Sequence, residues 1–497
     1  MAVAVTELVD ELAALLAPPV QRRETHGAWV LLSGEHAYKL RKAIRLPYLD
    51  YSGVAQRLHC ARQELALNQE LAPGLYLRVQ SLVRQGGALA FGPEGETDDA
   101  VDYVVVMRRF DEAATMAAHV AAGTLHAEDV DATARVIAAF HRHAQRADGD
   151  RGRVAARNLA DLDDLAELDA RDVDDDALRA FARAALRRHG DEIDDRARDG
   201  LWRDGHGDLR AEHVVVGDPI AIVDRVEFDP ALRRIDVASD LAFLAMDLEA
   251  LGAGWAARRL VDAYADAGGQ PASHALQALL AWQRAIVRLK IALLRGDAPN
   301  AERLHALAQT LAWRERACPV LLVCGPPASG KSTLARALAD LTGLRTVNTD
   351  VVRKQLHGVD PTTTLPADAY DDAVTRRVYE AVGAHAAAIV DEDGGVIVDA
   401  TARTAQERAA LRAGLDGRGP IRAIVCMVDR DTLRRRAQAR LRDPDRVSDA
   451  GPDVAVALAD AFDPPRPGHD GVVDVAQVDT SREGALAAAA AALDAAA

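Results

Sequence analysis

Lysine is rare in this chain of 497 residues, because only five of its 60 basic residues are lysines. A lysine carries a compact charge on a slim stem, whereas an arginine carries a planar fork of hydrogen-bond donors. With this bias, each lysine indicates a position where an arginine would serve less well. Two of the five fall in sequence contexts typical of phosphate binding, and the full set is Lys39, Lys42, Lys290, Lys331 and Lys354.

Cysteines, aromatic side chains and long hydrophobic runs are also scarce. The spacing of the four cysteines fits neither a zinc site nor a disulfide framework. Aromatic residues make up 4% of the chain, so the cores must consist largely of Leu, Val, Ala and Ile. No run of 18 apolar residues and no signal peptide is present, which excludes a membrane span. The sequence predicts a cytoplasmic protein with reduced thiols and no membrane partner.

The charge balance is acidic, with 76 acidic residues against 60 basic ones and a net charge of −16. Such an excess of negative charge makes nucleic acid an unlikely partner. Hydrophobic residues make up 49% of the chain, which is ordinary for a globular protein and excludes a disordered one. The length predicts about three domains.

The first 300 residues show a change from strand-like to helical patterns. Residues 1–110 contain a hairpin pattern at 28–46, a helix pattern at 54–72 and strand patterns at 75–84 and 100–110. These features predict a small β-rich lobe with one internal helix. The following part is mainly helical and extends over residues 111–300, with a β-rich patch at 213–228.

The last third of the chain has an alternating pattern of strands and helices. Gly296–Asn300 interrupts the preceding helices and is a candidate linker. Residues 315–497 are predicted to form a separate α/β domain with a parallel sheet. Its expected strands include residues 320–324, 396–399 and 422–428.

The strongest motif is the segment GPPASGKS at residues 325–332, which fits G-x-x-x-x-G-K-[ST] between an apolar strand and a helix. Gly325 and Gly330 permit a tight loop whose backbone N–H groups point at phosphate oxygens. Lys331 is expected to reach the β- and γ-phosphates of ATP, and Ser332 to bind Mg²⁺. Thr333 follows in the first turn of the helix and is included in the predicted nucleotide site.

Residues downstream of this loop indicate which class of P-loop protein the sequence resembles. Asp350 and Arg353 form a D-x-x-R element about twenty residues later. This element resembles that of small-molecule P-loop kinases such as gluconate kinase, chloramphenicol phosphotransferase and the zeta-toxin family. The resemblance implies that Asp350 faces the acceptor hydroxyl and that Arg353 binds substrate or orders the site. Asp399 ends a buried strand and suits a carboxylate that acts on the metal. Strand-end capping is the alternative for both aspartates.

An arginine-rich stretch extends from Leu433 to Arg446. Arg436 and Arg440 are four residues apart and share one helix face. Small P-loop kinases have such a lid, which neutralises charge on the transferred phosphoryl group. These two arginines are predicted to be catalytic, and the others are expected to form a solvated charged surface.

A second motif, HGDLRAEH, occupies residues 206–213. Protein kinases use H-R-D-x-x-x-x-N, in which the aspartate positions the acceptor and the asparagine holds metal. Asp208 and His213 have this spacing, and Asp224 follows where a metal-binding aspartate belongs. Upstream, Lys39 lies on a predicted strand and Glu64 on the next helix. This order matches that of the lysine–glutamate ion pair of protein kinases.

Residues 20–295 resemble the aminoglycoside phosphotransferase-like kinases, which share the protein-kinase fold. Two departures stand out: the chain has no G-x-G-x-x-G loop, and His213 stands where asparagine is expected. Imidazole is a poorer Mg²⁺ ligand than an amide oxygen, so this site is predicted to accept Mn²⁺. A degenerate domain without catalysis is the alternative.

Nearly the whole chain resembles an uncharacterised bacterial family that fuses such a kinase-like domain to a P-loop kinase domain. The resemblance rests on Ala37–Lys39, on residues 206–210 and on Glu227–Phe228. It implies an α+β, two-lobed N-terminal domain, an α/β C-terminal domain, and ATP-dependent phosphorylation of a small hydroxyl-bearing molecule. The alternatives are a regulatory protein with an ATPase switch and a polynucleotide 5′-hydroxyl kinase.

Overall fold

The computed structural model describes residues 5–25, 27–46, 49–168, 173–442 and 446–497. Within these ranges no helix is long and apolar enough to cross a membrane. Residues 443–445, which belong to the predicted arginine-rich stretch, lie outside the described residues.

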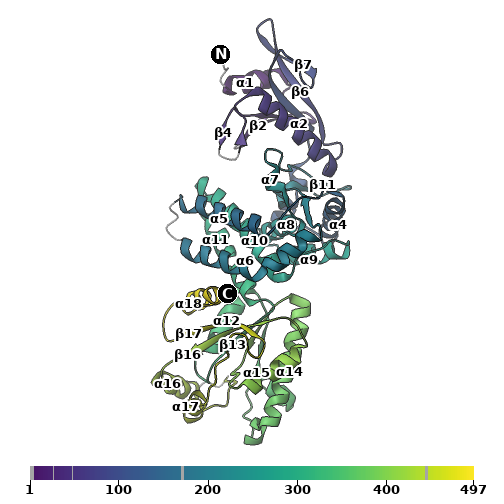
Figure 1. Cartoon of the computed structure of the whole chain (residues 1–497). Helices are drawn as coiled ribbons and strands as arrows, with labels where there is room; N and C mark the ends of the chain where they lie inside the picture. Colours follow the sequence, from purple (N-terminus) through teal and green to yellow (C-terminus); the bar gives the residue numbers. More distant parts are fainter. Residues whose placement is uncertain (1–4, 26, 47–48, 169–172, 443–445) are drawn as a thin grey trace. The chain divides into compact units, whose positions relative to one another are not determined.

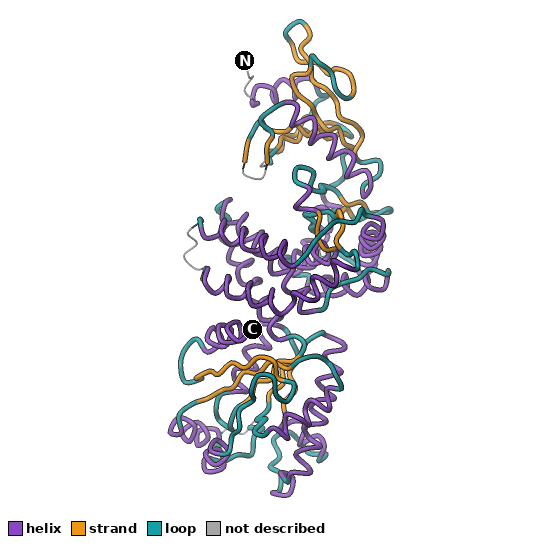
Figure 2. The backbone as a smooth tube through the Cα atoms, viewed as in Figure 1, coloured by secondary structure: helices purple, strands orange, loops and turns teal. Residues whose placement is uncertain are grey.

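Contacts divide the chain into two compact units, each assembled from two segments. The first unit comprises Met1–Asp150 and Asp194–Pro271, and the second comprises Arg151–Ile193 and Ala272–Ala497. Figure 1 and Figure 2 show the helices and strands of both units. This division differs from the boundary near residue 300 that the sequence suggests, because Gly296–Asn300 lies within the second unit.

The β-rich lobe of the first unit is a six-stranded antiparallel sheet in the order β1-β2-β3-β8-β6-β7. The predicted hairpin is confirmed as β2 and β3, and the predicted helix as α2. The elements of this lobe are α1 (Val5–Leu15), β1 (Val20–Glu24), β2 (Ala28–Ser33), β3 (His36–Arg41), β4 (Arg45–Leu46), β5 (Leu49–Asp50), α2 (Val54–Leu71), β6 (Tyr76–Gln85), β7 (Ala88–Glu94) and β8 (Ala100–Arg108).

Three of these strands are absent from the sequence prediction, namely β1, β7 and the two-residue strand β5. β1 has the sequence VQRRE and is mostly exposed at the sheet edge, so it lacks the hydrophobic alternation that identifies a strand. β7 lies in the glycine-rich segment that the sequence predicts as a connection. Gly86 and Gly87 have positive φ angles of 59° and 88° and form the tight turn from β6 into β7.

The remainder of the first unit is mainly helical. The predicted β patch at 213–228 is wrong over most of its length, because only two short strands form there. The turn between them contains Gly217 to Pro219, and Asp224 beyond them has a left-handed φ of 63°, which does not continue a strand. The elements are α3 (Met116–Ala122), α4 (Ala127–His143), β9 (Trp202–Asp204), β10 (Val214–Val215), β11 (Ala221–Ile222), α7 (Pro230–Arg233), β12 (Arg234–Asp236), α8 (Val237–Ala250) and α9 (Gly254–Asp266).

The second unit contains the predicted parallel sheet, with strand order β14-β15-β13-β16-β17. Alternate residues of β13 face two separate cores. Leu322 packs with Val382 of α14 and Leu411 of α15, whereas Leu321 packs with Leu338 of α12 and Leu493 of α18. Helices therefore cover both faces of the sheet, as the α/β class requires.

The predicted strands at 320–324, 396–399 and 422–428 agree closely with β13, β15 and β16. The elements of this region are β13 (Val320–Cys324), α12 (Lys331–Thr342), β14 (Thr346–Asn348), α13 (Thr349–Leu356), α14 (Asp372–Asp393), β15 (Val396–Asp399), α15 (Ala405–Leu415), β16 (Ile421–Met427), α16 (Arg430–Arg440), α17 (Pro452–Asp460), β17 (Val472–Asp479) and α18 (Ala485–Ala496).

Four further helices belong wholly or mainly to the second unit: α5 (Arg151–Ala166), α6 (Asp175–Arg198), α10 (His274–Leu294) and α11 (Ala298–Ala317). A buried cluster of charged side chains connects α6 and α11 to α18. Glu315 on α11 is fully buried and accepts hydrogen bonds from Arg188 Nη2 at 2.6 Å on α6. Arg316 beside it binds Asp494 of α18 at 2.6 Å. Helices α6 and α11 are therefore joined by buried ion pairs to α18, which packs on one face of the sheet.

Candidate functional sites

The glycine-rich loop in the second unit leaves no room for side chains at its two motif glycines. Gly325 has φ +142°, and a Cβ atom there would lie 2.5 Å from the carbonyl oxygen of Cys426. Gly330 has φ +91°, and its Cβ atom would lie 2.7 Å from Oγ1 of Thr480. The loop connects the end of β13 to the first residue of α12, so its backbone N–H groups and the helix N-terminus can face an anion.

Three residues at the start of α12 complete this cradle. Lys331 is buried, and Ser332 and Thr333 are exposed. A buried lysine at a helix N-terminus suits phosphate oxygens, and an exposed hydroxyl beside it can bind the metal that accompanies a nucleotide. The roles of these residues stay predictions from the motif.

The carboxyl ends of β14 and β15 bring two polar side chains together beside this loop. Nδ2 of Asn348 donates to Oδ2 of Asp399 at 2.7 Å. Oδ1 of Asn348 accepts from the backbone N–H groups of Asp350 and Val351 and thereby caps α13. Oδ1 of Asp399 is buried and has no partner among the described residues. An unpartnered buried carboxylate oxygen fits a role in holding a hydrated Mg²⁺ ion.

Asp350 and Arg353 project from α13 in the same neighbourhood. Burial raises the pKa of Asp350, while the charges of Lys331 and Arg353 act in the opposite direction. The Arg353 guanidinium is 5% exposed, donates to the carbonyl of Ala369 at 2.7 Å and stacks on the ring of Tyr370 at 4.7 Å. A carboxylate with a raised pKa is a stronger base and can accept a proton from a hydroxyl group.

The two predicted lid arginines lie on α16 and face the site. Arg436 donates to Oγ1 of Thr480 at 3.1 Å and to its carbonyl at 2.9 Å, which places it against the glycine-rich loop. Burial lowers the pKa of Arg440, while the charge of Asp350 acts in the opposite direction. Arg434 and Arg435 are exposed, in accordance with a solvated surface.

Sequence analysis gave no role to Lys354, which has zero exposure. Its Nζ donates to the carbonyls of Pro361 and Val447 at 2.9 and 2.6 Å, and to Oδ1 of Asp449 at 3.3 Å. Oδ2 of Asp449 accepts from the hydroxyl of Tyr370 at 2.6 Å. Lys354 thus joins the loop after α13 to the segment after α16. The rarity of lysine was the one sequence signal that singled it out.

In the first unit, a lysine and two carboxylates form the second candidate site. Nζ of Lys39 on β3 donates to Oε1 of Glu64 on α2 at 2.8 Å and to Oδ1 of Asp224 at 3.1 Å. The charge of Lys39 holds the pKa of Asp224 well below its usual range. Burial acts to lower the pKa of Lys39, but Asp224 and Glu64 raise it well above the ordinary value. Lys39 and Asp224 are therefore both charged near neutral pH.

A network around Glu227 supports this arrangement. Arg41 is 1% exposed and donates to Glu64 and, at 2.9 Å, to Oε1 of Glu227. The hydroxyl of Tyr51 donates to the same oxygen at 2.8 Å. Because Glu227 follows Asp224 by three residues, the network links the metal-binding segment to the β-rich lobe. The Glu227–Phe228 resemblance was the signal that marked this segment.

The loop that carries Asp208 is fixed by a buried carboxylate. Asp240 has zero exposure and accepts from the backbone N–H groups of His206 at 2.6 Å and Gly207 at 2.9 Å. Nε2 of His206 donates to the carbonyl of Val223 at 3.0 Å, which ties this loop to the segment of Asp224. Burial lowers the pKa of His206 to about 4, so this histidine is neutral at physiological pH.

Asp208 itself is held by the arginine two residues later. Nε and Nη2 of Arg210 donate to the two oxygens of Asp208 at 2.9 Å each. Burial acts to raise the pKa of Asp208, but the Arg210 charge lowers it below the ordinary value. Nδ1 of His213 donates to the carbonyl of Asp208 at 2.8 Å, and its Nε2 lies 3.6 Å from Oδ2 of Asp224. The structure therefore brings Lys39, Glu64, Asp208, His213 and Asp224 together.

Neither site provides a complete metal site from side chains. Among the described residues, no group of three or more His, Cys, Asp or Glu side chains is placed to hold a metal ion. Asp224 and, in the second unit, Ser332 and Asp399 are suited to Mg²⁺, which prefers oxygen ligands. A metal that binds here would take its other ligands from nucleotide phosphates and water.

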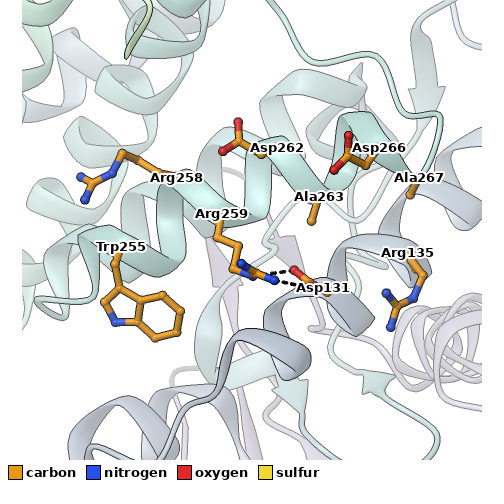
Figure 3. A pocket seen from close by; sticks show the side chains of 9 residues that line it. All are labelled: Asp131, Arg135, Trp255, Arg258, Arg259, Asp262, Ala263, Asp266 and Ala267. Atoms are coloured by element: carbon orange, nitrogen blue, oxygen red, sulfur yellow. Dashed lines mark hydrogen bonds and ion pairs between the residues drawn. The ribbon is translucent and has the colours of Figure 1, made fainter. Parts of the chain in front are cut away.

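A surface groove with a volume of about 540 Å³ lies between α4 and α9 in the first unit. Figure 3 shows Arg259 of α9 directed toward Asp131 of α4. The guanidinium and the carboxylate form two hydrogen bonds of 2.7 and 2.6 Å. Trp255 lies at the groove and is 44% exposed. The groove shares no residue with either candidate nucleotide site.

The fold and the side chains define two classes of kinase domain in one chain. The β-rich lobe, the Lys39–Glu64 pair and the Asp208 loop define a protein-kinase-like domain. The glycine-rich loop between β13 and α12 of a parallel sheet defines a P-loop kinase domain. Residues 320–465 match a family described as an AAA domain.

Curated relatives match almost the full length. The chain is 33% identical over 465 residues to an uncharacterized protein of Mycobacterium tuberculosis and to one of Mycobacterium bovis. The match covers 89% of this chain and 90% of each relative. The chain therefore belongs to the family of these mycobacterial proteins, as the resemblance predicted.

Solved structures are similar to parts of the chain. A choline/ethanolamine kinase family protein from Mesorhizobium loti covers 62% of this chain and 95% of its own, with 15% identity and a TM-score of 0.37. Wild-type aminoglycoside 2′-phosphotransferase-IIIa in its GDP complex covers 62% and 97%, with 14% identity and a TM-score of 0.37. A gluconokinase from Sinorhizobium meliloti covers 36% and 92%, with 20% identity and a TM-score of 0.25.

Proposed function

We propose that the protein is an ATP-dependent phosphotransferase with two nucleotide sites, and that it phosphorylates the hydroxyl group of a small molecule. One observation carries this proposal: each unit places an acceptor-side carboxylate in the same cluster as a lysine suited to phosphates. In the first unit these groups are Asp208 and Lys39, with Asp224 between them in the cluster. In the second unit they are Asp350 and Lys331, which interact electrostatically.

In the first unit, Lys39 would bind nucleotide phosphates while Glu64 holds it in position. Asp208 would orient the acceptor hydroxyl and take its proton as the phosphoryl group is transferred. Asp224 would hold the metal together with phosphate oxygens. Mg²⁺, when bound, neutralises charge on the phosphates and aligns them for transfer. His213 as a direct metal ligand, with Mn²⁺ in place of Mg²⁺, stays a prediction from the sequence.

In the second unit, the glycine-rich loop and Lys331 would hold the phosphates, and Ser332 would bind the metal. Asp350 would accept the proton of the acceptor hydroxyl, since a raised pKa makes its carboxylate a stronger base. Arg436 and Arg440 would neutralise charge on the transferred group. Arg353 would order the acceptor side of the site.

The test is a transfer screen with γ-labelled ATP over sugars, aminoglycosides, nucleosides and 5′-hydroxyl oligonucleotides, with the full chain. We expect a labelled small-molecule product in the wild type. Hydrolysis of ATP with no labelled acceptor would support an ATPase switch instead. A labelled oligonucleotide would support polynucleotide kinase activity, although the net charge of −16 disfavours it.

A further inference from the structure

Arg210 occupies the centre of the candidate site in the first unit. Its side chain is 11% exposed. Nε donates to Oδ1 of Asp208 and Nη2 to Oδ2, each at 2.9 Å, and Nη1 donates to Glu212. Nη2 also lies 3.0 Å from Nε2 of His213. One guanidinium therefore engages two carboxylates and one imidazole.

The hydrogen bonds of His213 fix which of its ring nitrogens carries the proton. A carbonyl oxygen can only accept, so Nδ1 must donate its proton to the carbonyl of Asp208. A guanidinium can only donate, so Nε2 must accept from Arg210. The lone pair on Nε2 of His213 is therefore directed at the guanidinium.

This lone pair is the one that a second metal would need. Protein kinases hold two Mg²⁺ ions, one by the aspartate at the position of Asp224 and the other by the asparagine at the position of His213. Here the second position presents a nitrogen that already has a positively charged partner. Arg210 also interacts electrostatically with Asp224 and with Asp247. The positive charge expected from a second metal is present in the protein itself.

We propose that Arg210 takes the place of the second divalent cation, so that ATP binds to the first unit with one metal ion, held by Asp224. Each oxygen of Asp208 keeps a lone pair beyond the one that Arg210 uses, so the carboxylate can still accept from a hydroxyl. Arg210 therefore serves two purposes: it orients Asp208 and supplies a charge for the phosphoryl oxygens. This inference rests on the proposed function of the first unit.

Mn²⁺ is the probe of metal number, because its electron paramagnetic resonance signal reports free and bound ions separately. The protein is the full chain with Lys331→Ala, which disables the second site, titrated in the presence of a non-hydrolysable ATP analogue. The chain with both Lys39→Ala and Lys331→Ala gives the background. We expect one bound Mn²⁺ per nucleotide above background, and no ¹⁴N coupling from an imidazole in the pulsed spectrum.

Arg210→Ala in the same background removes the guanidinium and frees His213. We expect the number of bound Mn²⁺ ions to rise from one to two, and ¹⁴N coupling to appear. Adding His213→Ala should return the number to one. Arg135→Ala, an exposed arginine on α4, removes the same charge elsewhere in the unit and should leave the number at one.

Two bound Mn²⁺ ions with Arg210 present would overturn the inference, and so would imidazole coupling with Arg210 present. Either result leaves the proposed phosphotransfer function intact, because nucleotide and metal still bind. Loss of all nucleotide-dependent Mn²⁺ binding at this site would overturn both the inference and the proposed function of the first unit. The count with Arg210 present needs no variant at the tested position, so misfolding of Arg210→Ala does not affect it.

Discussion

The two candidate sites hold their acceptor-side carboxylates in opposite ways. Asp208 is paired with a guanidinium through two hydrogen bonds, and that charge lowers its pKa. Asp350 is half-buried, and burial raises its pKa against the opposing charges of Lys331 and Arg353. The same proposed reaction therefore uses a charge-stabilised carboxylate in one unit and a desolvated one in the other. Arg210 positions Asp208 in the first site, whereas the partial burial of Asp350 sets its basicity in the second.

The groups proposed to bind phosphate also differ between the two units. In the first unit a side-chain ion pair, Lys39 with Glu64, connects a strand to a helix. In the second unit the backbone does most of this work, because Gly325 and Gly330 allow the loop to close around an anion. Substitution of Lys39 should therefore disable the first site, whereas a single methyl group added to the loop should already weaken nucleotide binding at the second.

The largest expected effect is on transfer by each site. Asp208→Ala and Asp350→Ala should each lower transfer at their own site by about 10²–10⁴-fold, because each removes the group that orients the acceptor hydroxyl. Nucleotide binding should persist in both variants. Transfer rates with γ-labelled ATP, measured in Lys331→Ala and Lys39→Ala backgrounds respectively, separate the sites.

Asp262→Ala is the control for these variants, since Asp262 is an exposed aspartate on α9. It should leave both rates unchanged. Unaltered transfer after Asp208→Ala would mean that the first unit does not catalyse transfer to that acceptor. Unaltered transfer after Asp350→Ala would mean the same for the second unit.

Loss of the buried charge cluster in the second unit should lower the free energy of unfolding. Glu315→Ala leaves Arg188 and His189 without their shared carboxylate. Breaking a buried pair in this way costs about 3–5 kcal/mol. The free energy of unfolding in urea, followed by circular dichroism, should fall accordingly. Glu302→Ala, an exposed glutamate on the same helix, should change it by less than about 0.5 kcal/mol.

A smaller effect is expected from one methyl group in the glycine-rich loop. Gly330→Ala places a Cβ atom 2.7 Å from Oγ1 of Thr480 at a φ of +91°, so the loop must shift. Nucleotide affinity at the second site should fall about tenfold or more, since a left-handed conformation alone costs an L-residue about 1–2 kcal/mol. Isothermal titration calorimetry in the Lys39→Ala background measures it. Gly296→Ala, with open space around its Cβ position, should leave the affinity unchanged.

The smallest effect is a difference in pH dependence. Asp350 acts in its ionised form, so transfer at the second site should decline as the pH falls through its raised pKa. The acid limb of kcat/KM should therefore lie above the ordinary carboxyl value of 3.8. At the first site, the pKa of Asp208 is lowered, so its limb should lie below that value. A limb for the second site at or below 3.8 would contradict the contrast between the two carboxylates.

The sequence predicted those parts of both sites that lie in short segments with fixed local geometry. A glycine-rich turn between an apolar strand and a helix has one arrangement, so Gly325 to Ser332 could be placed from their order alone. The sequence spacing of Asp208, His213 and Asp224 likewise predicted that these residues lie in one site. The roles of these residues stay predictions until activity is measured.

Other features depend on which side chains meet across long distances, and no local pattern encodes this. The sequence identifies Lys354 as unusual but not its bond to Asp449, 95 residues away. Arg210 lies inside the recognised motif, yet its contact with His213 depends on the fold of the loop. Amphipathic spacing predicts the helices between residues 151 and 193 but not that they pack in the second unit. Independent folding of residues 1–300 and 315–497 thus remains a prediction.

The most direct test of the account is the number of nucleotides that one chain binds. Titration calorimetry with a non-hydrolysable ATP analogue and Mg²⁺ should give two sites in the wild type. Lys39→Ala should lose one site, Lys331→Ala the other, and the double variant both. Lys42→Ala, a lysine three residues from Lys39 that pairs with Glu24 instead, should retain two. A single site in the wild type, unaffected by one of the two lysine substitutions, would contradict the claim that the chain contains two nucleotide sites.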